Sequence, residues 1–188
     1  MSAPGEAPAA VRLVKNVLSG DDEAFAELVR KHKGKVFGIV AKFVRNNADL
    51  DDICQEIFLK VYKNLKYFRG DAPLEHWVSK IAVNTCYDFL RKRRKMAEVP
   101  LEDVAFALSN PPTEDMSGSD AWNFLQRALS HLLPEERMVI TLLNLEEKSV
   151  REVSALTGWS EAKVKVRAFR ARQALKRILD DSYGKRST

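Results

Sequence analysis

The residues best suited to binding chemistry lie between Ser160 and Leu179, where basic side chains recur along a predicted helix. This stretch holds seven lysines and arginines and a single acid, Glu161. Guanidinium and ammonium groups bind phosphate oxygens and donate hydrogen bonds to the edges of bases. A charged helix that is merely solvated is the alternative, but such a helix normally mixes acids with its bases. The composition therefore favours a nucleic-acid contact.

Two helices around a tight turn must position these side chains. Ser149 and Glu152 have the spacing of a capping box, which predicts the start of the first helix, and Gly158 fits its left-handed end. Ser160 is the expected N-cap of the second helix. This arrangement is typical of the helix-turn-helix, whose second helix enters the major groove of DNA. The predicted buried face of the second helix is Val164, Ala168, Ala171, Leu175 and Leu179.

The opposite face of this second helix is the predicted DNA-reading face. Val166 and Phe169 lie near its centre, where a merely solvated helix has little reason to expose apolar groups. They offer only apolar contact to thymine methyl groups, so sequence reading is expected from hydrogen bonds of Arg170, Lys163 or Gln173 and from groove shape. Arg167 and Arg172 flank the buried face and are expected to reach phosphates or neighbouring helices. The DNA-reading set is Ser160, Ala162, Lys163, Lys165, Val166, Phe169, Arg170 and Gln173.

A second candidate surface lies on the helix expected over residues 49–62. Apolar residues three and four apart predict one buried face, and the other face is acidic and polar. Its carboxylates could bind a metal ion, but hard cations usually take their ligands from a tight loop. A solvated face or a protein-docking face is therefore favoured. The patch consists of Asp49, Asp52, Gln55 and Glu56.

A third candidate surface combines aromatic and basic residues. The loop expected over residues 66–77 places Phe68 beside Arg69, and the helix expected over residues 81–95 ends in five consecutive basic residues. Aromatic rings stack on unpaired bases, and cations hold the backbone of a single strand. A solvated helix end and a Phe68 that fills the local core are the alternatives. The candidate set is Phe68, Arg69, Trp77, Asn84, Arg91, Arg93 and Arg94.

Enzymatic chemistry finds little support in the sequence. The three histidines lie in different segments, at no ligand spacing with cysteine or carboxylate, and the two cysteines form no C-x-x-C pair. No glycine-rich loop that would cradle a phosphate is present. We therefore predict no catalytic residue, no metal site, no cofactor and no disulfide. The residues considered are His32, His76, His131, Cys54 and Cys86.

The charge distribution divides the chain of 188 residues into three parts. Residues 1–95 carry 18 basic and 12 acidic side chains, residues 96–120 carry none and 6, and residues 121–188 carry 13 and 8. Prolines, serines and the absence of bases mark residues 96–120 as a flexible acidic linker. The predicted fold is all-α, with two small helical domains at residues 1–95 and 121–188. Two basic domains predict an anionic polymer as partner.

Neither a membrane span nor a secretory signal is expected. The longest apolar run away from the termini has about five residues, and roughly twenty are needed to cross a bilayer. Residues 1–10 lack a basic start followed by an apolar core. We therefore expect no membrane insertion and a cytoplasmic protein.

Three motifs, taken in order along the chain, resemble the bacterial sigma factors of the small, two-domain extracytoplasmic-function (ECF) class. DLDDICQEIFLKVY, residues 49–62, resembles the helix that binds the clamp of RNA polymerase. FRGDAPLEHWV, residues 68–78, with the helix through Arg94, resembles the element that opens and reads the minus-10 promoter sequence. LPEERMVITLLNLEEKSVREVSALTGWSEAKVKVRAFRARQAL, residues 133–175, resembles the minus-35 reader.

The resemblance implies a factor that directs core polymerase to promoters and starts transcription. Its implied partners are RNA polymerase core, promoter DNA and an anti-sigma factor, and the acidic linker would enter the polymerase interior. The chain departs from many relatives at residues 160–167, SEAKVKVR, where Val166 replaces a common serine. Valine cannot donate a hydrogen bond, so the usual minus-35 preference does not carry over. An autonomous helix-turn-helix regulator is the alternative, but it would need a sensor or dimerisation module.

Overall fold

The computed structural model describes residues 6–44, 46–96 and 117–184. Every regular element within these ranges is helical, which confirms the all-α prediction. The helices form two compact units, one built on Met1–Phe89 and one on most of the chain from Leu90 onward. Two helical units were expected, although the division by contacts falls inside one long helix.

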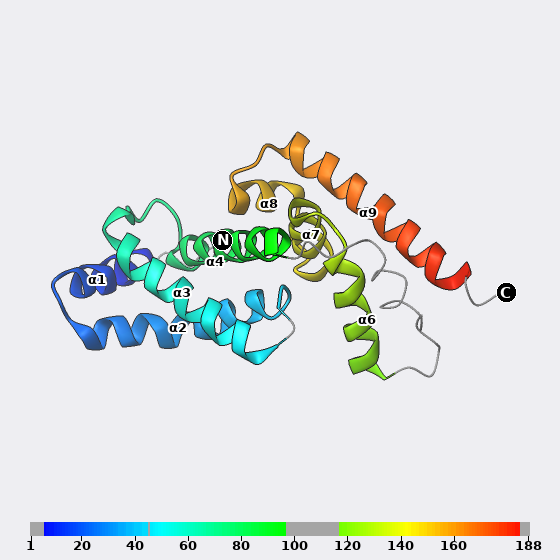
Figure 1. Ribbon diagram of the computed structural model, residues 1–188. Coiled ribbons are helices and arrows are strands. Elements are labelled where there is room, and N and C mark those ends of the chain that lie inside the picture. Colours follow the sequence, from blue (N-terminus) through cyan, green and yellow to red (C-terminus); the bar gives the residue numbers. More distant parts are fainter. Residues whose placement is uncertain (1–5, 45, 97–116, 185–188) are drawn as a thin grey trace. The chain divides into compact units, whose positions relative to one another are not determined.

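The first unit packs its helices in pairs. Its described elements are α1 (Glu6–Leu18), α2 (Asp22–Val40), α3 (Asn47–Asn64), the short 3-10 turn η1 (Leu65–Tyr67) and α4 (Leu74–Met96). Figure 1 labels the four α-helices. α2 lies beside α3, and α1 contacts both α2 and η1. Asp21 caps α2 by accepting from the amide of Ala24 at 3.0 Å. The side-chain oxygen of Asn46 caps α3 in the same way, from the amide of Asp49 at 2.7 Å. Such caps satisfy first-turn amides that have no partner within the helix.

Apolar residues at helical spacing supply the core of the first unit. Leu28 on α2 and Ile57 and Val61 on α3 are fully buried. Gly70, in the loop before α4, has a φ of +80°, and a Cβ there would lie 3.1 Å from the Val11 side chain. Both the backbone conformation and the close approach to α1 therefore favour glycine. Other buried residues are Val36, Val40, Phe43, Leu65, Val78, Ala82, Val83 and Cys86.

α4 begins earlier than the sequence predicts. The predicted loop runs through Trp77 and the predicted helix starts at residue 81, but α4 starts at Leu74, so Trp77 is helical. The amide of Trp77 donates to the carbonyl of Pro73 at 3.2 Å. Proline fits a helix start because it has no N–H to leave unpaired. The polar residues Glu75 and His76 interrupt the apolar period there, which is why the pattern missed this start.

The second unit contains the predicted helix-turn-helix. Its described elements are α6 (Gly118–Ser130), α7 (Pro134–Ile140), the π-helical turn η2 (Thr141–Leu145), α8 (Val150–Thr157) and α9 (Glu161–Gly184). The Ser149 and Glu152 capping box starts α8 as predicted, with reciprocal bonds of 3.2 and 2.8 Å. Gly158 ends α8 in the left-handed conformation with a φ of 74°. The local signals at these three residues therefore determine the turn.

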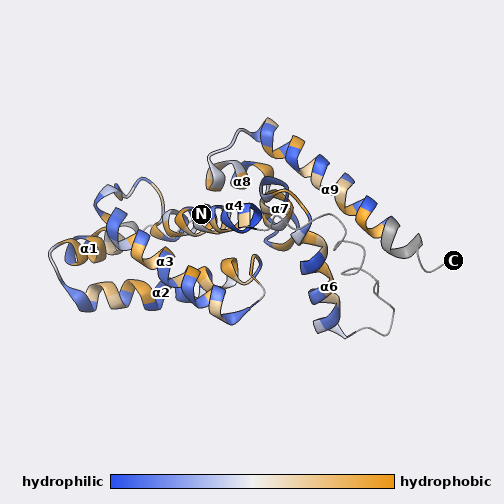
Figure 2. Ribbon diagram, viewed as in Figure 1, coloured by the Kyte–Doolittle hydropathy of each residue, from blue (hydrophilic) through white to orange (hydrophobic). Residues whose placement is uncertain are grey.

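One face of each helix supplies the core of the second unit. Figure 2 shows hydrophobic and hydrophilic bands alternating along α9, as expected when a single face is buried. A buried polar pair joins α6 to α7, because Arg137 donates to the side-chain oxygen of Gln126 at 3.1 Å. The buried residues include Phe124, Leu129, Leu132, Met138, Val139, Leu142, Val153, Val164, Ala168 and Ala171. Residues 97–116 of the predicted linker lie outside the described residues, so its flexibility stays a prediction.

Candidate nucleic-acid interface

The outer face of α9 exposes apolar and basic side chains together. Val166 is 49% exposed and Phe169 63%, whereas Val164, Ala168 and Ala171 on the opposite side are 0 to 3% exposed. The predicted rotation of the helix is therefore confirmed. Of the DNA-reading set, all but Lys163 are exposed: Ser160, Ala162, Lys165, Val166, Phe169, Arg170 and Gln173.

Hydrogen bonds fix the start of α9. The Ser160 hydroxyl accepts from the amide of Lys163 at 3.2 Å, which confirms Ser160 as the N-cap. The hydroxyl of Ser154 on α8 donates to the carbonyl of Trp159 at 2.6 Å and so spans the turn. These contacts orient the first turn of α9, the part of a recognition helix that enters a major groove.

Glu135 at the start of α7 holds two cations of α9. Its Oε1 lies 2.8 Å from Lys163 Nζ, and its Oε2 lies 2.6 Å from Arg167 Nε. The Lys163 ammonium also lies 4.3 Å from the centroid of the Trp159 ring. Arg167 thus reaches a neighbouring helix, one of its two predicted roles. Lys163 is half-buried rather than open on the outer face.

The acidic patch on α3 divides into two kinds of residue. Asp52 and Gln55 are exposed, whereas Asp49 and Glu56 are half-buried and have partners within the chain. The amide nitrogen of Asn46 donates to the Asp49 carboxylate at 2.8 Å, which completes the cap of α3. These four side chains lie along one helical face, as predicted.

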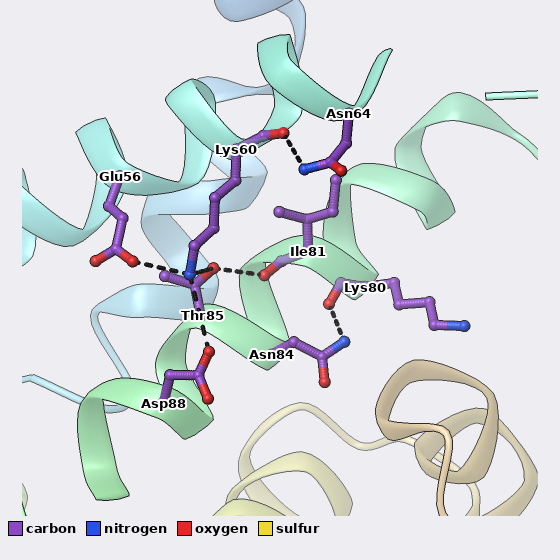
Figure 3. Close-up of polar contacts among 8 residues, drawn as sticks. All are labelled: Glu56, Lys60, Asn64, Lys80, Ile81, Asn84, Thr85 and Asp88. Atoms are coloured by element: carbon purple, nitrogen blue, oxygen red, sulfur yellow. Dashed lines mark hydrogen bonds and ion pairs between the residues drawn. The ribbon is translucent and has the colours of Figure 1, made fainter. Parts of the chain in front are cut away.

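Figure 3 shows how Lys60 ties this patch to α4. Lys60 Nζ lies 2.8 Å from the Glu56 carboxylate, 3.3 Å from the Thr85 hydroxyl and 3.8 Å from the Asp88 carboxylate. The Thr85 hydroxyl in turn donates to the carbonyl of Ile81 at 2.9 Å. One ammonium group therefore joins the polar face of α3 to the middle of α4.

Two exposed apolar residues extend the α3 patch and were missed by the sequence analysis. Leu59 is 59% exposed and Tyr62 51%, and the Tyr62 ring packs edge to face on Phe25 at 5.0 Å. Leu59 lies four residues after Gln55 and Tyr62 three after Leu59, so both continue the face of Gln55. That spacing in the sequence could have predicted that Leu59 and Tyr62 lie on the same face as Gln55. The patch is therefore polar at one end and apolar at the other.

Three members of the third candidate set follow one side of α4. Phe68 and Trp77 are half-buried and pack edge to face, with ring centroids 5.7 Å apart. Trp77, Asn84 and Arg91 are seven residues apart and share one helical face. The Asn84 amide donates to the carbonyl of Lys80 at 2.8 Å, one turn earlier (Figure 3). The remaining members, Arg69, Arg93 and Arg94, are exposed.

The described residues hold no group of three or more histidine, cysteine or acidic side chains that could bind a metal ion. Burial raises the pKa of the Cys54 thiol, and the neighbouring carboxylate of Asp51 raises it further. This thiol is therefore less readily ionised than an ordinary cysteine. Within the described ranges, none of the helices is long and apolar enough to cross a membrane.

Known proteins match this chain on both units. Residues 28–96 match the family model for Sigma-70 region 2, and residues 125–175 match the model for Sigma-70, region 4. The ECF RNA polymerase sigma factor SigM of Mycobacterium tuberculosis is 31% identical over 162 residues, which cover 86% of this chain and 80% of SigM. The chain belongs to the ECF RNA polymerase sigma factors. The sigma-factor prediction is therefore confirmed, and this sigma factor directs core polymerase to promoters and initiates transcription.

Two solved structures resemble the fold of this sigma factor. CnrH, in complex with the cytosolic domain of CnrY, has 25% identity and a TM-score of 0.60, with 89% of this chain and 95% of CnrH covered. The sigma factor RpoE of Bartonella quintana, in complex with the anti-sigma factor NepR, has 20% identity and a TM-score of 0.57. That likeness covers 83% of this chain and 96% of RpoE. It supports the all-α fold.

Proposed function

We propose that the sigma factor assigns separate promoter and polymerase contacts to three surfaces. The α3 patch docks on core polymerase, the Phe68 loop and α4 open and hold the minus-10 element, and α9 reads the minus-35 element. The single observation that carries this proposal is the outer face of α9. Val166, Phe169 and Arg170 lie exposed there, opposite the buried Val164, Ala168 and Ala171.

The face of α9 can recognise DNA in two ways. Arg170 donates hydrogen bonds in the geometry that guanine accepts, and Gln173 can pair with adenine. Val166 and Phe169 offer apolar contact to thymine methyl groups. Ser160, Ala162 and Lys165 complete the exposed surface near the helix start. Sequence preference is therefore expected to depend most on Arg170 and Gln173.

The α4 side can hold a single strand. Opening the minus-10 element requires bases to leave the stack, at a cost of a few kcal/mol for each step. Phe68 and Trp77 supply aromatic surface for such a base, and Asn84 lies two turns further on. Arg91, Arg93 and Arg94 are exposed where they can hold phosphates.

The proposed domains are residues 1–95 and 121–188, joined by the acidic segment 96–120. A segment with six acids and no bases carries negative charge as a nucleic-acid strand does, so it suits a path inside the polymerase where it mimics nucleic acid. The sigma factor would work in the cytoplasm without catalytic activity of its own. An anti-sigma factor is a proposed partner, supported by the structure of RpoE with the anti-sigma factor NepR.

Dependence on core polymerase tests the proposal as a whole. Purified protein with and without core polymerase is added to promoter DNA, and binding and transcript formation are measured. The sigma factor is expected to give promoter-specific binding and transcripts only with core. Specific binding without core would instead support an autonomous regulator.

Arg170→Ala tests the assignment of α9. Transcription is measured from a promoter library randomised across the minus-35 element. Loss of a base contact costs roughly 1–3 kcal/mol and relaxes the choice at that base, whereas loss of a phosphate contact weakens all sequences alike. Arg170→Ala is expected to flatten the preference at particular positions, and the control Lys176→Ala to scale activity down uniformly. An intact preference in Arg170→Ala would reject the assigned orientation of α9.

A further inference from the structure

Glu135, at the start of α7, contacts two cations of the proposed recognition helix α9. Its carboxylate meets Lys163 at 2.8 Å and Arg167 at 2.6 Å, so each oxygen has its own cation. The side chains are 22% exposed for Glu135, 38% for Lys163 and 25% for Arg167. Water screens such pairs less than pairs on the open surface, and hydrogen bonds between two ionised groups are stronger than neutral ones.

Lys163 is held from two directions. Glu135 comes from α7, and the Trp159 ring from the turn before α9 lies 4.3 Å from the ammonium. The electron-rich face of an indole ring attracts an ammonium group, so this contact adds to the ion pair in holding Lys163. Lys163 must leave both partners before it can bind a DNA phosphate as an unrestrained cation. Arg167 must likewise leave a contact of 2.6 Å.

We infer that Glu135 is a specificity-determining residue for minus-35 recognition, because it withholds Lys163 and Arg167 from the DNA backbone. The inference rests on the proposed role of α9. Phosphate contacts raise affinity for every sequence, whereas base contacts discriminate. With two cations withheld, a larger share of the binding free energy comes from base readers such as Arg170. Glu135 thus lowers total affinity and raises the ratio of specific to non-specific binding.

A purely structural role for Glu135 predicts the opposite sign. If the carboxylate only fastened α9 to α7, its loss would loosen the recognition helix and weaken binding to the promoter. If it withholds cations, its loss strengthens binding to all DNA and steepens the dependence on salt. The sign of the affinity change and the salt slope therefore separate the two roles.

The test compares Glu135→Gln with the control Glu136→Gln in holoenzyme made from the full chain and core polymerase. Glu136→Gln removes the same charge from the same helix end, but the Glu136 carboxylate accepts from the amide of Leu133 at 3.3 Å, within the cap of α7. Affinity is measured between 50 and 200 mM salt on a library-selected promoter and on the same promoter with a scrambled minus-35 element. Each added phosphate contact steepens the slope of log affinity against log salt by about 0.9. As salt rises from 50 to 200 mM, the affinity of Glu135→Gln for DNA is expected to fall about threefold more than that of Glu136→Gln for each of the two cations that the substitution frees to bind phosphate.

Discrimination between the two promoters gives the second readout. Glu135→Gln is expected to bind the scrambled promoter more tightly at low salt and to discriminate less than Glu136→Gln does. Combining Glu135→Gln with Lys163→Met should remove the part of the change that Lys163 carries. An unchanged slope with weaker binding to both promoters would overturn the inference, as would equal behaviour of the two glutamine variants.

Lys163→Met keeps the inference testable if Glu135→Gln fails to fold. A withheld lysine makes little phosphate contact, so Lys163→Met should leave the salt slope of the native protein unchanged. A slope lowered by about one would show that Lys163 already binds a phosphate, and would overturn the inference for that residue. Arg170→Ala runs in parallel. If it leaves minus-35 preference intact, the proposed role of α9 fails, whereas a flattened preference with no Glu135 effect rejects only the present inference.

Discussion

Phe68→Ala distinguishes a base-binding role in strand opening from a simple packing role. The Phe68 ring is half-buried and packs edge to face on Trp77 at 5.7 Å. Full burial of a phenylalanine side chain stabilises a fold by roughly 1.5–3 kcal/mol, and an aromatic pair adds roughly 0.5–1.5 kcal/mol. At half burial, Phe68→Ala should lower the free energy of unfolding by about 1–3 kcal/mol. Since native proteins have about 5–15 kcal/mol of stability, the variant should remain folded.

The proposed contact with an extruded base predicts a larger effect on transcription than on folding. Stacking of one base on an aromatic ring is worth roughly 1–3 kcal/mol, or about 5- to 150-fold in the population of open promoter. A template that is already mismatched across the minus-10 region does not require unstacking by the protein. Phe68→Ala should therefore fail on duplex promoter and recover most of its activity on the mismatched template.

The assay measures open-complex formation and transcript yield on both templates with native and variant holoenzyme. Tyr67→Ala is the matched control, because Tyr67 is an adjacent aromatic residue that is 64% exposed. Thermal unfolding of each variant shows that the fold is retained. An equal loss on the two templates would refute the base-holding role and would leave Phe68 as a packing residue beside Trp77.

Three further predictions concern the α3 patch, the turn and pH. Asp52→Ala with Glu56→Ala should weaken core binding by about 2 kcal/mol, or roughly thirtyfold, and unchanged core affinity at native helicity would remove that assignment. Gly158→Ala should lower the free energy of unfolding in urea by about 1–2 kcal/mol, because alanine is strained at the Gly158 φ of +74°. No atom lies within 4 Å of the added Cβ, so no steric clash adds to this cost, and a larger loss would contradict the prediction. Burial lowers the pKa of His32 from 6.5, although Glu75 opposes the shift. The neutral His32 side chain therefore contributes stability that is present above pH 6.5 and is lost as the pH falls through the lowered pKa. His32→Gln should reduce the difference in urea midpoint between pH 7.5 and 5.5. An unchanged difference would count against this prediction.

Local signals made the helix-turn-helix predictable from the sequence. The Ser149 box, Gly158 and Ser160 act within a few residues of the bonds that they form, and each has the predicted role. The start of α4 was not predictable from apolar spacing, because polar residues follow Pro73. The exposure of Leu59 depends on which neighbours pack against α3, and a single sequence does not specify them. Prediction therefore succeeded where local capping signals were clear. It failed where polar residues interrupted the apolar spacing, as at the start of α4, and where tertiary neighbours decide exposure, as at Leu59.

Tertiary contacts also decide how many cations of α9 are free to bind DNA. The sequence shows seven basic residues and one acid between Ser160 and Leu179. From the sequence alone, every one of these cations would be free to bind DNA phosphates. Glu135 lies 28 positions before Lys163 in the chain, yet the fold brings its carboxylate to 2.8 Å from that lysine. Since an ion-paired cation releases fewer counterions on binding DNA, the salt slope should follow the cations left unpaired rather than the total. If α9 reads the minus-35 element as proposed, tertiary contacts help to set its affinity for DNA and remove Lys163 from the residues that helical period places on the reading face.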